Sequence, residues 1–252
     1  MKKFALLAVI GAMLGACEDP IDIIDPSVLD NRNVYIQVNT YWGNQIAKRN
    51  KGYLVNGSRV TLDNVYITLT GFEYITGNGD TLRTESDLTV AELLGTKNIK
   101  LGYLEPGSYA GTLRYFIGIE DDRALKAPST YAEDHQLNGG EIWHGATLGH
   151  SHFQIDGSVY AETDSTLTGS FDPLMWRFAT EDLMIEKTET RNFNVGSGID
   201  VFFVVNLNLE NIFVGLYPGV TPEINCDPGN SIDYDAGKIV RDNLNAEFNF
   251  EI

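Results

Sequence analysis

The feature that most constrains the fold of this chain is a series of short β-rich runs separated by turn signals. β-branched and aromatic residues dominate at positions 34–38, 60–62, 64–70, 109–119 and 152–155. Asn56-Gly57, Gly77-Asn78-Gly79-Asp80 and Asp156-Gly157 are residue pairs and runs typical of tight turns. Several short strands with regular turn signals favour an all-β architecture.

Helix signals are sparse, and no composition break or internal repeat divides residues 33–252. One helical turn is predicted at 89–94, where Thr89 and Glu92 have capping-box spacing, and a short helix is predicted at 235–244 before a final strand at 246–252. The apolar run Val201 to Val205 predicts a strand in the centre of a sandwich. We therefore expect a single antiparallel β-sandwich with long loops and little helix.

The first residues predict export and lipidation. Lys2-Lys3 precede an apolar run at 4–14, and Leu14-Gly15-Ala16-Cys17 follows. This is the pattern of a secretory signal peptide (residues 1–16) ending in a lipobox, in which Cys17 is acylated and becomes the first residue of the mature chain. The alternative is an ordinary signal peptide that happens to end near a cysteine. The prediction is a lipid-anchored protein of the bacterial outer membrane, on its periplasmic face or at the cell surface.

Residues 17–32 read as an acidic tether between the lipidated Cys17 and a domain at 33–252. The whole chain carries a formal charge of −17, which argues against nucleic acid as a partner. With Cys17 lipidated, Cys226 is the one remaining thiol, so no intramolecular disulfide can form. Cys226 is either an inert thiol, which we favour, or a soft metal ligand.

No catalytic motif is recognisable. The chain lacks a G-x-S-x-G elbow, a Walker loop, a G-x-G-x-x-G loop, an H-E-x-x-H helix and an EF-hand loop. Its many acidic residues permit carboxylate pairs, but their spacing supports no glycosidase assignment. We predict that the protein is not an enzyme.

The four histidines of the chain are crowded into one segment: they are His135, His144, His150 and His152. On a strand, residues i and i+2 project from one face, so His150 and His152 could converge on one ion, with His144 or His135 as a third ligand. Imidazole favours copper, zinc or nickel over calcium or magnesium. The alternative is a solvated, glycine-rich loop without a ligand. Trp143, beside His144, is either a packing anchor or an aromatic group at the site.

Several segments, in the same order along the chain, resemble the MbnP-like lipoproteins, the family of the periplasmic partner protein of methanobactin uptake and of related copper-binding surface proteins. They are Tyr66-Ile67-Thr68-Leu69-Thr70-Gly71-Phe72, Gly107-Ser108-Tyr109, Leu113 through Ile119, Ile142-Trp143, Gly149 with residues 153–157, and residues 201–213. Together they span roughly residues 33–252, and no one of them is a unique signature.

The resemblance implies a β-sandwich and a copper ion held by histidine and by a tryptophan oxidised to kynurenine. Carried over to this chain, it implies Trp143 with His144, His150 and His152 as neighbouring ligands. Two positions depart from the family pattern. Gly145 stands where a second tryptophan is usual, and Arg177, which cannot act as a neutral ligand, stands where a later histidine is frequent.

Two functions follow from the sequence. The first is a non-enzymatic envelope lipoprotein that binds a transition metal, copper in first place, through the histidine-rich loop. The second is an interaction lipoprotein that partners an outer-membrane receptor or binds an extracellular ligand without a metal.

Overall fold

The computed structural model describes residues 32–251 except 80, 84–86, 197 and 227–228. The predicted signal peptide, Cys17 and nearly all of the predicted tether lie outside these residues. In the described part of the chain, no helix is long and apolar enough to cross a membrane.

The smaller of two sheets has four strands and is built on β1 (Arg32–Trp42). β1 pairs with β12 (Val201–Asn208) on one side, with β7 (Thr96–Leu104) on the other, and with the short β2 (Gln45–Ile46) at its end. The pairing of β1 with β12 is parallel, whereas those with β2 and β7 are antiparallel. β1 alternates between buried and partly exposed residues, as expected of a strand that packs one face on a core.

The larger sheet has nine strands and is organised by the long strand β4 (Ser58–Thr76). Its path is β11 (Ile185–Val195), β8 (Gly107–Ile117), β4, β9 (Phe153–Ala161), β10 (Phe171–Phe178) and β13 (Glu223–Ile224). The short strands β3 (Tyr53–Val55), β5 (Thr81–Arg83) and β6 (Leu88–Glu92) also pair with β4.

Along its length, β4 pairs first with β9 and then with β8. β9 pairs with it as far as Ile67, and β8 pairs with it from Leu69 onward. Thr68, between these two stretches, bonds through its backbone to the ends of both partners: its N–H donates to the carbonyl of His152, and its own carbonyl accepts from the N–H of Gly118. We call this point, formed by Thr68, Gly118 and His152, the fork of the large sheet.

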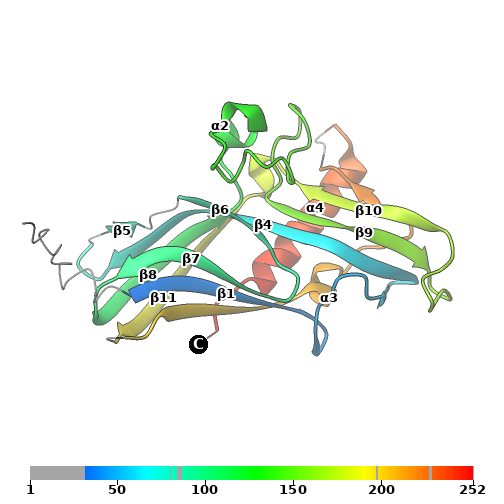
Figure 1. Ribbon diagram of the computed structural model, residues 1–252. Helices are drawn as coiled ribbons and strands as arrows, with labels where there is room; N and C mark the ends of the chain where they lie inside the picture. The colour runs from blue at the N-terminus through cyan, green and yellow to red at the C-terminus, as the bar shows by residue number, and fades with distance from the viewer. Residues whose placement is uncertain (1–31, 80, 84–86, 197, 227–228, 252) are drawn as a thin grey trace, which may run out of the picture.

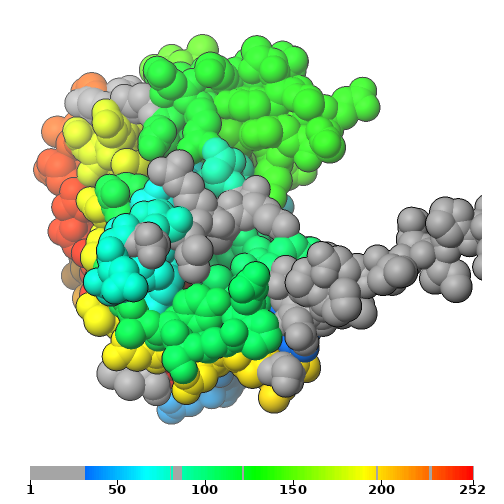
Figure 2. Space-filling view, turned by 90° about the vertical axis from the view of Figure 1, so that its left-hand side faces the viewer, coloured from blue at the N-terminus to red at the C-terminus, as the bar shows by residue number. Residues whose placement is uncertain are grey.

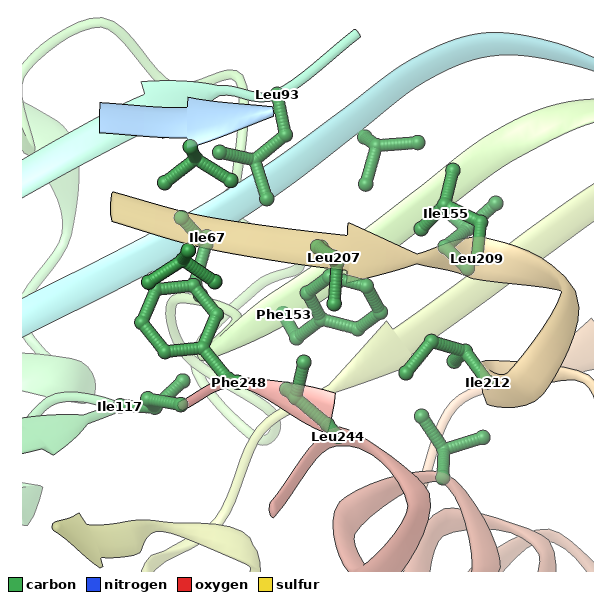
Figure 3. Close-up of a cluster of buried hydrophobic side chains, with 14 of the residues drawn as sticks. Ile67, Leu93, Ile117, Phe153, Ile155, Leu207, Leu209, Ile212, Leu244 and Phe248 are labelled. Carbon is green, nitrogen blue, oxygen red and sulfur yellow. The ribbon is translucent and has the colours of Figure 1, made fainter. Parts of the chain in front are cut away.

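The core lies between the two sheets and is closed by α3 (Leu209–Ile212) and α4 (Ser231–Glu247). Figure 3 shows side chains from β4, β8, β9, β12 and α4 meeting in this layer, among them Ile67, Ile117, Phe153, Leu207 and Leu244. Each is buried, and full burial of one such side chain stabilises the fold by about 2 kcal/mol. The all-β sandwich predicted from the sequence is confirmed.

The longest connection of the large sheet leaves β8 at the fork and returns to β9 at the fork. This segment, residues 118–152, contains α2 (Asp121–Ala124) and η1 (Pro128–Thr130), and we call it the histidine loop. It stands above the sheet in Figure 1, and Figure 2 shows it in green, projecting from the body. It has its own hydrophobic cluster, made of Leu88, Ile119, Ala124, Leu137 and Ile142.

Two local predictions are wrong. Residues 88–92 form β6 rather than a helical turn, because their backbone groups pair with β4 from Tyr66 to Thr70. Asp156-Gly157 is not a turn but lies inside β9, opposite Leu62 and Asn64, where β4 carries a bulge. A side chain on Gly157 would collide with the carbonyl oxygen of Thr61, so this glycine permits a close strand contact.

The C-terminal region differs from the prediction in extent. The helix predicted at 235–244 is confirmed as the core of α4, which begins at Ser231 and continues to Glu247. The final strand predicted at 246–252 is wrong over the described residues, where a single bridge joins Phe250 to Val205. The strand predicted at 201–205 exists as β12, but it lies at the edge of the smaller sheet instead of the centre.

Candidate functional site

His152 is part of the fork and is 2% exposed. Its Nδ1 accepts a hydrogen bond from the backbone N–H of Ile119 at 3.1 Å, so the proton of the neutral ring is on Nε2, which donates to the carbonyl of Thr180 at 2.7 Å. The ring lies against Gly118, where any Cβ would be about 3.0 Å from it. Both ring nitrogens of His152 therefore join the ends of β8 and β10 to the start of β9.

His150 is fully buried in the histidine loop. Its Nδ1 lies 2.8 Å from the carbonyl oxygen of Ala124, and its Nε2 lies 3.2 Å from that of Leu137. The indole of Trp143 packs on the ring with centroids 4.7 Å apart. His150 thus lies against three separate parts of the loop, and both of its nitrogens face carbonyl oxygens, to one of which a neutral ring donates.

A small ladder sets the position of Trp143 and His144. Residues 142–144 run beside 149–151: the N–H of Ser151 donates to the carbonyl of Ile142, and the N–H of His144 donates to the carbonyl of Gly149. Gly149 has φ +76°, and a Cβ there would lie 2.5 Å from the carbonyl oxygen of Ala124. Only glycine fits this close approach.

Gly145 turns the chain immediately after His144 and has φ +90°. The backbone conformation here is one that residues with a side chain rarely adopt. The turn of this loop after His144 therefore favours a glycine.

His144 differs from the two buried histidines, because its ring belongs to the wall of a cavity. Its Nε2 lies 2.8 Å from Oε1 of Gln154, an acceptor, so Nε2 carries the proton and Nδ1 keeps its lone pair. Gln154 in turn donates through Nε2 to the Asp156 carboxylate. Nδ1 of His144 has no hydrogen-bond partner among the described residues.

The charge state of His144 follows from its surroundings. Burial lowers the pKa of His144 to about 4, against the hydrogen bond with Gln154, which raises it; the nearby Arg177 and His150 lower it further. Burial also raises the pKa of Asp156, while Gln154 and Arg177 oppose that shift. His144 is consequently a neutral imidazole at pH 7.

The cavity beside His144 has a volume of about 700 Å³ and is open to solvent. Its lining comes from the histidine loop, from β10, from β13 and the residue after it, and from the start of α4. Its lining residues are Trp143, His144, Thr147, Leu148, Arg177, Glu223, Asn225, Asn230 and Asp233. We call it the His144 cavity.

Charge in the His144 cavity is mixed. Arg177 contributes a guanidinium group, whose Nε is buried without a hydrogen-bond partner and whose Nη2 lies 3.5 Å from the Met175 sulfur. Glu223 and Asp233 contribute carboxylates. With His144 neutral, two negative groups outweigh one positive group, so the wall as a whole favours a cation.

The fourth histidine lies apart. His135 is stacked on Tyr131 with centroids 4.4 Å apart, and its Nδ1 accepts from the backbone N–H of Leu137. It does not line the His144 cavity. Within the part of the chain that the structure describes, no three His, Cys, Asp or Glu side chains lie close enough together to hold a metal ion.

The arrangement thus separates the residues that the sequence grouped. Trp143 and His144 reach a cavity, His150 and His152 have both ring nitrogens turned to backbone groups, and His135 stacks elsewhere in the loop. Residues 150–152 precede β9 and are not a regular strand, so the rule that i and i+2 share a face does not place these two rings on one ion.

Sequence reasoning overlooked the residues that support His144. The sequence places Gln154 in a strand and Asp156 in a turn, whereas in the structure both lie in β9, where Gln154 bonds to His144 and Asp156 accepts from Gln154. The available signal was that Gln154 and Asp156 are two residues apart and so share one face of the strand, opposite to the face of Phe153 and Ile155. Glu223, Asn225 and Asp233 could not be placed beside His144 without knowing that β13 pairs with β10.

Cys226 is buried at the base of α4, with its sulfur close to Gly237. Burial raises the pKa of the Cys226 thiol well above its usual range. The thiolate is the form that binds metals and reacts, so this environment agrees with an inert thiol.

No family model matches the chain, and no curated protein matches it. Among solved structures, the chain is similar to MbnP from Methylosinus trichosporium, with 12% sequence identity and a TM-score of 0.45. The alignment covers 73% of this chain and 78% of that one.

Proposed function

We propose that this protein is a non-enzymatic envelope lipoprotein that binds a transition metal ion at His144, with copper as the preferred ion. The observation that carries the proposal is the neutral imidazole of His144, whose Nε2–H is donated to Gln154 and whose Nδ1 is left for a ligand beside an open cavity.

Three properties of His144 support metal binding. A metal needs the neutral form of imidazole, and the lowered pKa of His144 maintains it. A histidine that binds a metal usually donates its other N–H to a neighbouring acceptor, as His144 does to Gln154. The two carboxylates of the cavity wall, Glu223 and Asp233, add the negative charge that attracts a cation.

The choice of copper rests on donor type. An imidazole suits copper, zinc and nickel, and the indole of Trp143 is a polarisable aromatic group next to it. A single histidine with an open cavity fits a low-coordinate ion completed by water or by a second molecule. In this proposal His150 and His152 do not bind the metal; they position the loop that carries Trp143 and His144.

The test is metal content. The mature protein is exposed to equimolar Cu(I), Cu(II), Zn(II) and Ni(II), desalted, and measured by inductively coupled plasma mass spectrometry. We expect one copper ion per chain in the wild type and in His135→Ala, and none in His144→Ala. His135→Ala is the matched control, because it removes the same ring from the same loop outside the cavity.

Retention of copper by His144→Ala would overturn the proposed site, and absence of copper from the wild type would overturn the function. The peptide mass of the Trp143 region from the same samples reports whether the indole is oxidised.

A second candidate function is supported by the cavity itself. About 700 Å³ is room for a small polar molecule or the end of a peptide, and Arg177 offers a guanidinium group to its anionic part. An interaction lipoprotein that binds an extracellular ligand or an outer-membrane receptor through the histidine loop would use this cavity without a metal. Loss of ligand or receptor binding in Arg177→Gln, with metal absent from the wild type, would favour it.

The location is part of the proposal. Lipidation at Cys17 would attach the acidic chain to the outer membrane, facing the periplasm or the cell surface, with the membrane as its first partner. Incorporation of labelled palmitate into the wild type and not into Cys17→Ser is the expected result. Labelling of both proteins would refute lipidation at this residue.

A further inference from the structure

Large apolar side chains gather on the outer side of the smaller sheet, at the end where β1 begins. Tyr35 of β1 and Phe202 of β12 are cross-strand partners, and their rings stack with centroids 5.1 Å apart. Tyr103 of β7 belongs to the next row of the same sheet, and Ile199 lies two residues before β12. Phe202, Tyr103 and Ile199 are 43%, 47% and 70% exposed. We call these four residues the β1 patch, and Figure 2 looks onto this end of the molecule.

Strand alternation explains why these side chains are not in the core. Val34 and Ile36 of β1 are buried, so Tyr35 between them points to the opposite face of the sheet. Phe203 of β12 is buried as well, and Phe202 beside it points outward with Tyr35. The smaller sheet thus presents large apolar side chains to solvent at one end, which is typical of an interaction surface.

A lysine accompanies the aromatic rings. Lys100 of β7 lies opposite Tyr35, its Nζ is 3.8 Å from the centroid of the Tyr103 ring, and it donates to the Tyr103 hydroxyl at 2.7 Å. Rings with a polar tip are suited to the boundary between membrane and water, where the ring body enters the apolar layer and the tip stays hydrated. A lysine beside such rings can extend its ammonium group to lipid phosphates.

The charges next to the β1 patch balance on the smaller sheet. Arg32 and Lys100 are basic, whereas Asp200 and Glu105 are acidic. Asp200 accepts hydrogen bonds from the backbone and the side-chain N–H groups of Asn33. A patch without net charge is not repelled by a lipid surface, although the chain as a whole is acidic. Contact at this patch is therefore driven by the burial of apolar surface.

The β1 patch lies where the N-terminal segment joins the domain. Arg32 begins β1 and pairs with Leu104, so the chain that leads from Cys17 enters at this end. Residues 18–31 separate Cys17 from Arg32, and a chain of this length spans at most about 50 Å. An acylated Cys17 would hold the patch within this distance of a bilayer. Linkage of this kind makes a weak second contact effective.

We infer, on the basis of the lipid anchor in the proposed function, that the β1 patch is a membrane-contact surface and that its partner is the lipid bilayer. Phe202, Ile199 and Tyr103 enter the boundary between headgroups and acyl chains, and the smaller sheet faces the membrane. The histidine loop stands over the opposite side of the sandwich, on the larger sheet. This orientation leaves the His144 cavity open to solvent.

The test uses lipid vesicles and the mature chain without acyl groups, residues 17–252 with Cys17→Ser, so its outcome does not depend on lipidation. Ile199→Cys then supplies the accessible thiol for a polarity-sensitive fluorophore, because Cys226 is buried. We expect the fluorophore at position 199 to shift its emission to shorter wavelength when vesicles of phosphatidylethanolamine and phosphatidylglycerol are added. Val220→Cys is the matched control, 82% exposed between α3 and β13, and its fluorophore should not shift.

Removal of side chains measures the apolar contact. Phe202→Ser combined with Ile199→Ser should lower the partition coefficient into these vesicles at least about tenfold, since two exposed apolar side chains are lost. Tyr217→Ser combined with Val220→Ser removes an exposed aromatic and an exposed aliphatic side chain outside the patch, and should leave the coefficient unchanged. Added salt should not release the wild type, because salt screens charges and not apolar contacts.

An emission shift at position 220 and none at 199 would mean that another face meets the bilayer, and would overturn the inference. Equal partition of the wild type and the Phe202→Ser, Ile199→Ser variant would overturn it too, as would absence of vesicle binding. Release by salt would contradict apolar insertion. A shift that needs no vesicles and grows with protein concentration would assign the patch to a second copy of the chain. Failure of palmitate labelling at Cys17 would refute the anchor and leave these vesicle results unchanged.

Discussion

His152 and His144 belong to the same short segment, but the fold uses their rings in opposite ways. The His152 ring lies at the fork of the large sheet, and both of its nitrogens bond to backbone groups. The His144 ring lies eight positions earlier in the wall of an open cavity, and one of its nitrogens bonds to Gln154.

The difference teaches how burial assigns the role of a histidine. A buried imidazole must satisfy both nitrogens within the protein, since an unpaired polar group in the interior is costly. A ring at the edge of a cavity can leave one nitrogen to a ligand. Proximity in sequence therefore does not make histidines members of one site.

The largest expected effect is on stability, from His152→Ala. The change leaves the N–H of Ile119 and the carbonyl of Thr180 without their partner and opens a void at the fork, so we expect the free energy of unfolding to fall by about 4 kcal/mol. Urea unfolding of the metal-free protein, followed by circular dichroism, measures it.

His144→Ala is the control for this measurement and should lose no more than about 1 kcal/mol, because the ring lies in the wall of an open cavity and the substitution removes one hydrogen bond, to Gln154. If the free energy of unfolding of His152→Ala also fell by less than about 1 kcal/mol, the two histidines would not differ in their contribution to stability.

The next effect concerns the ladder that holds the histidine loop. Gly149→Ala forces a residue with a Cβ into a left-handed conformation and against the carbonyl of Ala124, so we expect a loss of about 2 kcal/mol in the stability of the loop. Hydrogen exchange of amides between 142 and 151 should accelerate while that of β1 stays unchanged. Gly196→Ala, where a Cβ would meet no atom within 4 Å, is the control.

The effect of the hydrogen bond between His144 and Gln154 can be tested without removing His144 itself. Gln154→Leu removes the acceptor of the His144 Nε2–H, so we expect copper affinity to fall about 10- to 100-fold while the protein remains folded. A competition titration with a copper chelator measures the affinity. Gln45→Leu, on exposed β2, makes the same change away from the cavity and should leave affinity at the wild-type value.

The smallest expected effect is a pH dependence. The pKa of His144 is about 4 in the folded protein and near 6.5 in the unfolded chain, so the unfolded chain binds more protons below pH 6.5. The stability that comes from a neutral His144 is present above about pH 6.5 and is lost as pH falls toward 4.

Because His144 is partly open to solvent, we expect the metal-free wild type to lose only about 1 kcal/mol more than His144→Gln between pH 7 and pH 5. Urea unfolding of both proteins at the two pH values gives this difference. Equal losses would mean that His144 titrates in the fold as it does in the unfolded chain.

The sequence by itself determined the strands and several turns, because these depend on neighbouring residues. The β-rich runs at residues 34–38 and 64–70 became parts of β1 and β4, and Asn56-Gly57 became the turn between β3 and β4. The predicted helix at 235–244 became α4 for the same reason. The resemblance to a family also rested on short segments of this kind.

Only the tertiary structure decided which histidine faces a cavity. Gln154, Arg177 and Glu223 come from three strands, and their meeting with His144 depends on sheet register. Register also made Asp156-Gly157 part of β9 and residues 88–92 part of β6, against their local signals. Residue type sets what a side chain can do, but distant strands set its solvent exposure and hydrogen-bond partners, and these decide whether it serves the fold or a ligand.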